Sequence, residues 1–192
     1  NAVMAAEAAL YLGCPKNKVI SAVRSFRGNE HRLEFVREID GIRFCNDSAS
    51  TNPETAVAAI EAFSGPKILI AGGKDKNLDY KPLAQALKSS DTRLVILFGE
   101  NRNKIKRSIR HQASGVKHQA PSIKPYDIIL SKNLRSAVAV AYEVASSLYT
   151  KHRIPNTIIF SPASASFDMF RDYKERGEKF KEMVKNLKRY NT

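Results

Sequence analysis

The chain has 192 residues, of which 43% are hydrophobic and 27% charged, a composition that excludes an intrinsically disordered protein. Its 32 basic and 19 acidic side chains give a formal net charge of +13, which favours anionic partners such as phosphates, carboxylates or nucleic acid. No apolar run approaches the ~20 residues needed to span a bilayer, and the two cysteines lack the spacing of metal ligands. We therefore expect a cytoplasmic protein with reduced thiols, no metal site of its own and no membrane partner.

The N-terminal segment predicts two helices. Residues 2–12 indicate a buried helix that ends at Gly13, and Pro15 can open a second helix that runs to Phe26. Asn1 lies inside the apolar helical pattern and is not an initiator methionine, so we expect the chain to be a piece of a longer polypeptide.

A domain boundary is expected near residue 30, because Gly28 breaks the second helix. Extended runs follow at 33–39 and 42–46, and Asp40-Gly41 between them is a strong signal for a two-residue hairpin turn. Apolar strands then alternate with helices. The expected helices cover 53–63, 79–87, 100–111, 134–148 and a closing basic segment, and the expected strands cover 67–71, 93–98 and 157–160, with an uncertain strand within 115–127. This alternation predicts an α/β fold for residues 31–192, a Rossmann-like, mostly parallel sheet with helices on both faces.

Three polar segments follow expected strands, where ligands bind in open α/β sheets. They are Asn46–Asn52, Gly72–Lys76 and Ser161–Ser166. Hydroxyls, lysines and backbone N–H groups at helix starts suit the capture of an anion.

Each segment also has a structural explanation. Asp47, Ser48 or Thr51 could cap a helix, Gly72-Gly73 could only turn the chain, and the small residues of Ser161–Ser166 could serve close packing. The phosphate-loop pattern GxxxxGK[ST] and the dinucleotide pattern GxGxxG are both absent from the sequence. These patterns alone predict an α/β domain with an anion-binding edge.

Basic residues also gather near the C-terminus, at helical spacing beside acidic and apolar residues. They are Lys174, Arg176, Lys179, Lys181, Lys185, Lys188 and Arg189. A solvated helix face explains them about as well as a binding surface does, so nucleic acid is not an expected partner.

Several separated motifs give the chain a resemblance to the Mur ligase family, and within it to the members that add D-glutamate. The motifs are His31-Arg32-Leu33-Glu34, Asn46–Asn52, Gly72–Lys76, Ser161–Phe170, and Glu175-Arg176-Gly177 with Phe180. They occur in the family's order. The resemblance covers the whole chain, because residues 1–30 resemble the closing helices of the family's central ATP-binding domain.

The resemblance implies the C-terminal portion of an ATP-dependent amide ligase of peptidoglycan precursor synthesis. Such an enzyme adds D-glutamate to UDP-N-acetylmuramoyl-L-alanine through an acyl phosphate. Its partners would be D-glutamate, ATP and the UDP substrate. ATP and Mg²⁺ would be held mainly by N-terminal and central domains of the same polypeptide, so the chain alone is expected to be inactive.

The resemblance also assigns site residues. Arg32 and His31 take catalytic positions; Arg32, Asn46 and Asp47 take nucleotide-binding positions; and Thr51, Lys76, Ser166, Phe167 and Tyr173 take D-glutamate-binding positions. A lysine with two hydroxyls suits a dicarboxylate, and the planar donors of an arginine suit phosphate. The sequence departs from the family pattern at Ala49, where a lysine is usual.

Two alternatives remain open at this point. One is a Mur-like or polyglutamate-type ligase that acts on another acidic amino acid. The other is a stand-alone basic α/β module that binds nucleotides or nucleic acid. A phosphate loop encoded upstream would favour a ligase, and a start codon just before Asn1 would favour the module.

Overall fold

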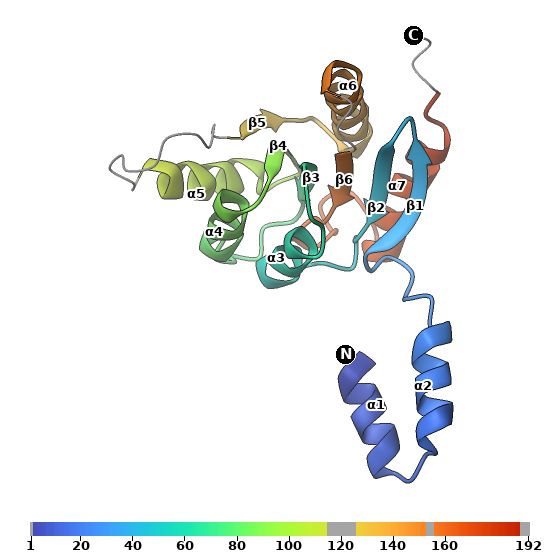
Figure 1. Ribbon diagram of the computed structural model, residues 1–192. Coiled ribbons are helices and arrows are strands. Elements are labelled where there is room, and N and C mark those ends of the chain that lie inside the picture. The colour runs from blue at the N-terminus through green and yellow to red at the C-terminus, as the bar shows by residue number, and fades with distance from the viewer. Residues whose placement is uncertain (1, 115–125, 153–155, 189–192) are drawn as a thin grey trace.

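The structure is a computed structural model that describes residues 2–114, 126–152 and 156–188. Helices α1 (Ala2–Tyr11) and α2 (Lys16–Ser25) form a hairpin that stands apart from an α/β body (Figure 1). The prediction of a buried first helix is wrong, because α1 has no buried residue among those described. Its apolar side chains are exposed because α1 packs against α2 and not against the sheet. None of the described helices is both long and apolar enough to cross a bilayer.

The body is built on a six-stranded sheet with the order β1-β2-β6-β3-β4-β5. The strands are β1 (Glu34–Ile39), β2 (Ile42–Asn46), β3 (Lys67–Gly72), β4 (Thr92–Phe98), β5 (Asp127–Leu130) and β6 (Asn156–Phe160). Only the β1–β2 pair is antiparallel among the described strands, which confirms the mostly parallel sheet. The hairpin at Asp40-Gly41 is also confirmed, with φ of 50° and 75° at its two turn residues, as a type I′ turn requires.

Helices cover both faces of the sheet, as predicted. Helices α3 (Pro53–Glu61), α4 (Lys81–Ser89) and α5 (Arg102–Ser114) pack on one face, and α6 (Leu134–His152) and α7 (Tyr173–Lys185) pack on the other (Figure 1). The chain moves in one direction across the sheet from β2 to β5 and then returns to β6. Because crossovers between parallel strands are right-handed, the returning helix α6 must lie on the opposite face. The uncertain strand expected within 115–127 overlaps β5, and residues 115–125 lie outside the described part.

Two apolar cores result from this coverage. Strand β3 is buried along its whole length, with Ile68 and Ile70 facing α6 and α7 while Leu69 and Ala71 face α3 and α4. A strand buried on both faces needs a continuous apolar run instead of an alternating one, which explains the sequence of β3. Residue 30 lies in the linker between α2 and β1, and both the domain boundary expected there and the assignment of residues 1–30 to an ATP-binding domain stay predictions.

The stack of Phe160 on Phe180 joins β6 to α7 and supplies the first test. The two rings lie 4.6 Å apart between centroids, and both side chains are fully buried. Phe180→Ala should lower the free energy of unfolding by about 3–5 kcal/mol, because it removes apolar contacts and leaves a cavity.

Equilibrium urea denaturation of the chain measures this loss. Tyr11→Ala is a matched control, since it truncates an aromatic side chain that is 92% exposed. The control should change the free energy of unfolding by less than about 0.5 kcal/mol. Equal losses in the two variants would show that Phe180 does not stabilise the core.

Candidate functional site

Three loops meet at the carboxyl edge of the sheet because they follow the neighbouring strands β2, β6 and β3. These are the segments Asn46–Asn52, Ser161–Ser166 and Gly72–Lys76. Backbone bonds join them: the N–H of Lys74 donates to the carbonyl of Ala165 at 2.9 Å, and the N–H of Gly72 donates to the carbonyl of Pro162 at 2.9 Å. The loops that the sequence marked as anion-binding therefore form one continuous edge.

Arg176 of α7 ties these loops together from behind. Its side chain is fully buried. Its Nε donates to Ser48 Oγ at 3.0 Å, its Nη2 to the Ser48 carbonyl at 2.8 Å, and its Nη1 to the Ser164 carbonyl at 2.9 Å. Gly73 passes so close that a Cβ there would lie 2.2 Å from the Ala165 carbonyl and 3.2 Å from Nη1 of Arg176, so no other residue fits.

The burial of Arg176 overturns one sequence interpretation. A solvated helix face does not explain all the C-terminal basic residues, because Arg176 is 0% and Lys181 8% exposed, whereas Lys174 and Lys179 are exposed. Burial lowers the pKa of Arg176 to about 9, so its guanidinium still carries a charge at neutral pH. The sequence signal for this role was the Glu175-Arg176-Gly177 motif, to which we assigned no function.

A second buried network fixes the same loops from the side of β4. The side-chain amide of Asn101 donates to Tyr80 OH at 2.6 Å and to Ser164 Oγ at 2.7 Å. Its carbonyl oxygen accepts from the N–H of Gly73 at 2.9 Å. Burial raises the pKa of Tyr80, which keeps the phenol neutral. Sequence reasoning missed Asn101 and Tyr80, because neither belongs to a recognisable motif.

The predicted nucleotide-binding residues Asn46 and Asp47 lie inside the protein. The Asp47 carboxylate accepts hydrogen bonds from the N–H of Leu33 at 3.1 Å and from Ser50 Oγ and Ser161 Oγ at 2.5 and 2.7 Å. Burial raises the pKa of Asp47, and these bonds oppose that rise. Asp47 thus connects the start of β1 to two loops, and its role toward a nucleotide stays a prediction.

Arg32 points outward from a strained turn. His31 and Leu33 on either side have φ of 62° and 46°, which non-glycine residues rarely adopt. Side-chain acceptors hold both positions, since the N–H of His31 donates to Glu34 Oε2 at 2.9 Å and that of Leu33 donates to Asp47. Arg32 itself is exposed, and its charge lowers the pKa of Asp47. The turn therefore exposes the Arg32 guanidinium to solvent in the linker between α2 and β1.

Two of the predicted D-glutamate-binding residues touch each other. The Lys76 ammonium lies 5.7 Å from the centroid of the exposed Phe167 ring. Ser166 adjoins Phe167 and is buried, with its carbonyl accepting from the N–H groups of Met169 and Phe170. The structure thus brings the Gly72–Lys76 loop against the end of the Ser161–Ser166 loop.

The other two predicted residues lie on neighbouring elements. Thr51 is half-buried before α3, and Tyr173 begins α7 with its ring packed edge-on against His31 at 6.1 Å. Helix α3 is capped by Asn52, whose Oδ1 accepts from the N–H of Thr55 at 2.9 Å. The suggestion that Asp47, Ser48 or Thr51 supplies this cap is wrong.

The two lysines of the glycine loop differ in their partners. Lys74 forms an ion pair with Glu100 at 2.7 Å, which raises the pKa of Lys74 and neutralises its charge locally. Within the described part of the chain, Lys76 forms no ion pair with a carboxylate. Lys76 thus keeps an ammonium at this edge with which no described carboxylate pairs, and its role toward a ligand stays a prediction.

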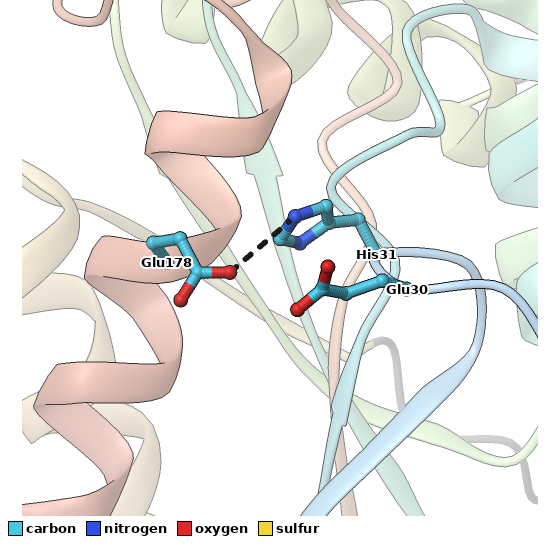
Figure 2. A group of neighbouring side chains, drawn as sticks. All are labelled: Glu30, His31 and Glu178. Atoms are coloured by element: carbon cyan, nitrogen blue, oxygen red, sulfur yellow. Dashed lines mark ion pairs between the residues drawn. The ribbon is translucent and has the colours of Figure 1, made fainter.

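The linker between α2 and β1 brings Glu30 and His31 close to Glu178 of α7 (Figure 2). One ligand atom from each lies within 4.8 Å of the others, a spacing that could suit a metal ion. Lys181, however, already contacts Glu30 at 2.5 Å and Glu178 at 2.7 Å, and it also contacts Glu34. Burial alone would lower the pKa of Lys181, but these bonds raise it. The ammonium already pairs with both carboxylates of the group, so the residues present do not fit Mg²⁺.

Comparisons with known proteins agree with this geometry. A family described as "Mur ligase, glutamate ligase domain" matches residues 31–149. UDP-N-acetylmuramoylalanine–D-glutamate ligase of Pelotomaculum thermopropionicum is 39% identical over 190 residues, which are 98% of this chain and 37% of the relative. The corresponding ligase of Clostridium acetobutylicum is 40% identical over 96% of this chain and 37% of its own length. The chain thus spans well under half the length of these relatives.

Solved structures share the fold. Folylpolyglutamate synthase of Mycobacterium tuberculosis superposes with a TM-score of 0.61 at 15% identity, covering 95% of this chain and 38% of that protein. UDP-N-acetylmuramoylalanyl-D-glutamyl-2,6-diaminopimelate–D-alanyl-D-alanyl ligase of Acinetobacter baumannii gives 0.55 at 14% identity, covering 93% and 34%. At such low identity these similarities describe architecture alone.

Cys45, the residue before Asn46 on β2, gives a chemical test of this edge. Burial, with the neighbouring charges of Asp47 and Glu34, raises the pKa of its thiol to about 12, so the thiol is protonated at pH 8. Cys14 is exposed. Ellman's reagent should therefore modify Cys14 rapidly in the folded chain and modify Cys45 only after unfolding in guanidinium chloride. A folded Cys14→Ser variant that still reacts rapidly would contradict the burial of Cys45, which is 3% exposed.

Proposed function

The chain belongs to the Mur ligase family, and from this premise we propose that it binds D-glutamate for an ATP-dependent ligase that joins this amino acid to UDP-N-acetylmuramoyl-L-alanine. The observation that carries the proposal is the Lys76 ammonium, which lies over Phe167 beside Ser166 without a carboxylate partner among the described residues. A dicarboxylate needs such a cation with nearby hydroxyl donors. The names of the relatives add support for D-glutamate as the amino acid.

The reaction proceeds in two steps in this proposal. The γ-phosphoryl group of ATP passes to the carboxylate of the UDP substrate, which gives an acyl phosphate and ADP. The D-glutamate amine then attacks the acyl carbon, phosphate leaves, and the amine loses a proton. The chain's own part is to hold D-glutamate with Lys76, Thr51, Ser166, Phe167 and Tyr173, so that its amine reaches the acyl phosphate.

Residues outside this chain complete the site in the proposal. The relatives are more than twice as long as the chain, and the sequence contains no phosphate-loop pattern. We therefore assign ATP, Mg²⁺ and the UDP group mainly to N-terminal and central domains of a cytoplasmic polypeptide. Residues 1–30 would close its ATP-binding domain, and residues 31–192 would form its amino-acid-binding domain. Arg32 would reach the ATP phosphates from the hinge, with His31, Asn46 and Asp47 beside it.

A ligase assay tests the proposal. The complete polypeptide should form ADP, phosphate and the D-glutamyl product from ATP, Mg²⁺, UDP-N-acetylmuramoyl-L-alanine and D-glutamate. The 192-residue chain alone should form none of them. L-glutamate with a folate acceptor should give no product, which separates the proposal from a polyglutamate ligase. Product from the folate acceptor instead of the UDP substrate would overturn the substrate assignment.

Lys76→Ala in the complete polypeptide tests the amino-acid site itself. Loss of a charge-assisted hydrogen bond costs about 1.5–3 kcal/mol, so the D-glutamate KM should rise about ten- to a hundredfold. Ser166→Ala should raise it less, because a neutral hydroxyl contributes less than an ammonium. The KM values for ATP and the UDP substrate should hardly change.

Steady-state kinetics with each substrate varied in turn measures these effects. Lys88→Ala is the matched control, since Lys88 is an exposed lysine in the last turn of α4. If Lys76→Ala leaves both the D-glutamate KM and kcat unchanged, Lys76 is only a solvated loop residue and the site assignment is wrong.

A further inference from the structure

Arg176 carries a buried charge that the protein does not pair with a carboxylate. All three of its hydrogen-bond acceptors are neutral oxygens, two from Ser48 and one from Ser164. Among the described residues it forms no ion pair. The facing acid is Asp168, whose charge favours the guanidinium but whose Oδ2 accepts from the N–H of Glu100 at 3.1 Å.

Such an arrangement is unfavourable in a protein that only needs its loops joined. Removing a charge from water is costly when no carboxylate hydrogen-bonds it, even though Asp168 offsets part of the cost, and a neutral amide can donate to two of the same oxygens. Desolvation is also the main cause of the lowered pKa of Arg176. The charge therefore requires a reason beyond hydrogen bonding.

The position of Arg176 supplies that reason. Its acceptors, Ser48 and Ser164, belong to the loops that present Thr51 and Ser166, and Gly73 beside its Nη1 belongs to the loop that presents Lys76. A carboxylate held at this edge would lie on the solvent side of the buried guanidinium, whose charge solvent screens less than it screens an exposed one. Position 49 at this edge is alanine, so the edge also lacks the ammonium that the family's usual lysine would supply.

We propose that Arg176 is a positioning residue whose buried, unpaired charge strengthens the binding of the dicarboxylate at the loops it joins. The inference rests on the proposed function and extends it. Arg176 does not touch the ligand. Its charge makes the electrostatic potential behind Lys76 more positive. Its hydrogen bonds fix the separation of the loops that carry the ligand-binding groups.

Charge and hydrogen bonding can be separated with two variants of the complete polypeptide. Arg176→Gln keeps neutral donors but removes the charge, and it should raise the D-glutamate KM about tenfold or more while kcat changes less than about threefold. Arg176→Lys keeps a positive charge while its ammonium is protonated, and at about pH 5.5 its D-glutamate KM should lie well below that of Arg176→Gln. Lys179→Gln, on the exposed face of the same helix, is the control and should behave as the unmodified enzyme.

A pH profile gives an independent reading if Arg176→Gln does not fold. Burial lowers the pKa of a fully buried lysine by up to about 3–5 units, so Arg176→Lys should lose its proton between about pH 5.5 and 8, whereas arginine stays protonated. The ratio of its D-glutamate KM to that of the unmodified enzyme should therefore rise across this range. The groups that also face this site, Asp168, Lys74 and His31, are the same in both enzymes, so their contributions cancel in the ratio.

The outcomes separate the two proposals. An unchanged KM in a folded Arg176→Gln variant, or a flat KM ratio for Arg176→Lys, would overturn the role of the charge while leaving the ligase proposal intact. Equal rises for the Gln and Lys variants at about pH 5.5 would show that Arg176 acts only through its hydrogen bonds to the loops. If the unmodified polypeptide makes no D-glutamyl product, the proposed function fails and this inference fails with it.

Discussion

The hydrogen bonds of the Arg176 guanidinium are the constraint on which the candidate site depends. They hold Ser48 and Ser164, from loops that follow two different strands, to a single planar group. The guanidinium also lies 6.0 Å from the centre of the Phe160 ring, beneath the end of β6. Because Gly73 packs against the same group, the third loop can occupy only a narrow range of positions. The relative placement of three loops thus reduces to the position of one side chain on α7.

The topology of the sheet explains why one side chain can reach three loops. Strand β6 is inserted between β2 and β3, although it is the last strand in the sequence. The helix that follows it, α7, therefore starts at the carboxyl edge and crosses behind neighbouring loops that are far apart in the chain. The return of the chain at β5 makes this insertion possible, and the right-handed crossover rule then places α6 on the face that α7 also covers.

Charged groups hold the linker between α2 and β1 in place. Lys181 draws Glu30 of the linker and Glu34 of β1 toward α7, while Asp47 and Glu34 accept the N–H groups of the strained turn around Arg32. The carboxylates of Asp47 and Glu34 are thus used to fix backbone geometry, and Arg32 is left exposed to solvent. An observed strain of this kind indicates a functional position, because the surrounding bonds must offset it.

The sequence by itself determined the α/β class, the hairpin at Asp40-Gly41, the places of most helices and strands, and the three polar loops, because periodicity and turn chemistry are local properties. Motif resemblance then marked Lys76 and Phe167, which the structure brings together. Only the tertiary structure decided the strand order, the inward direction of Asp47, the exposure of α1 and the burial of Arg176. A basic residue at helical spacing looks the same in sequence whether its face meets water or a sheet. What separates Arg176 from Lys179 is the packing of α7 against loops more than a hundred residues away in the chain, such as that of Ser48.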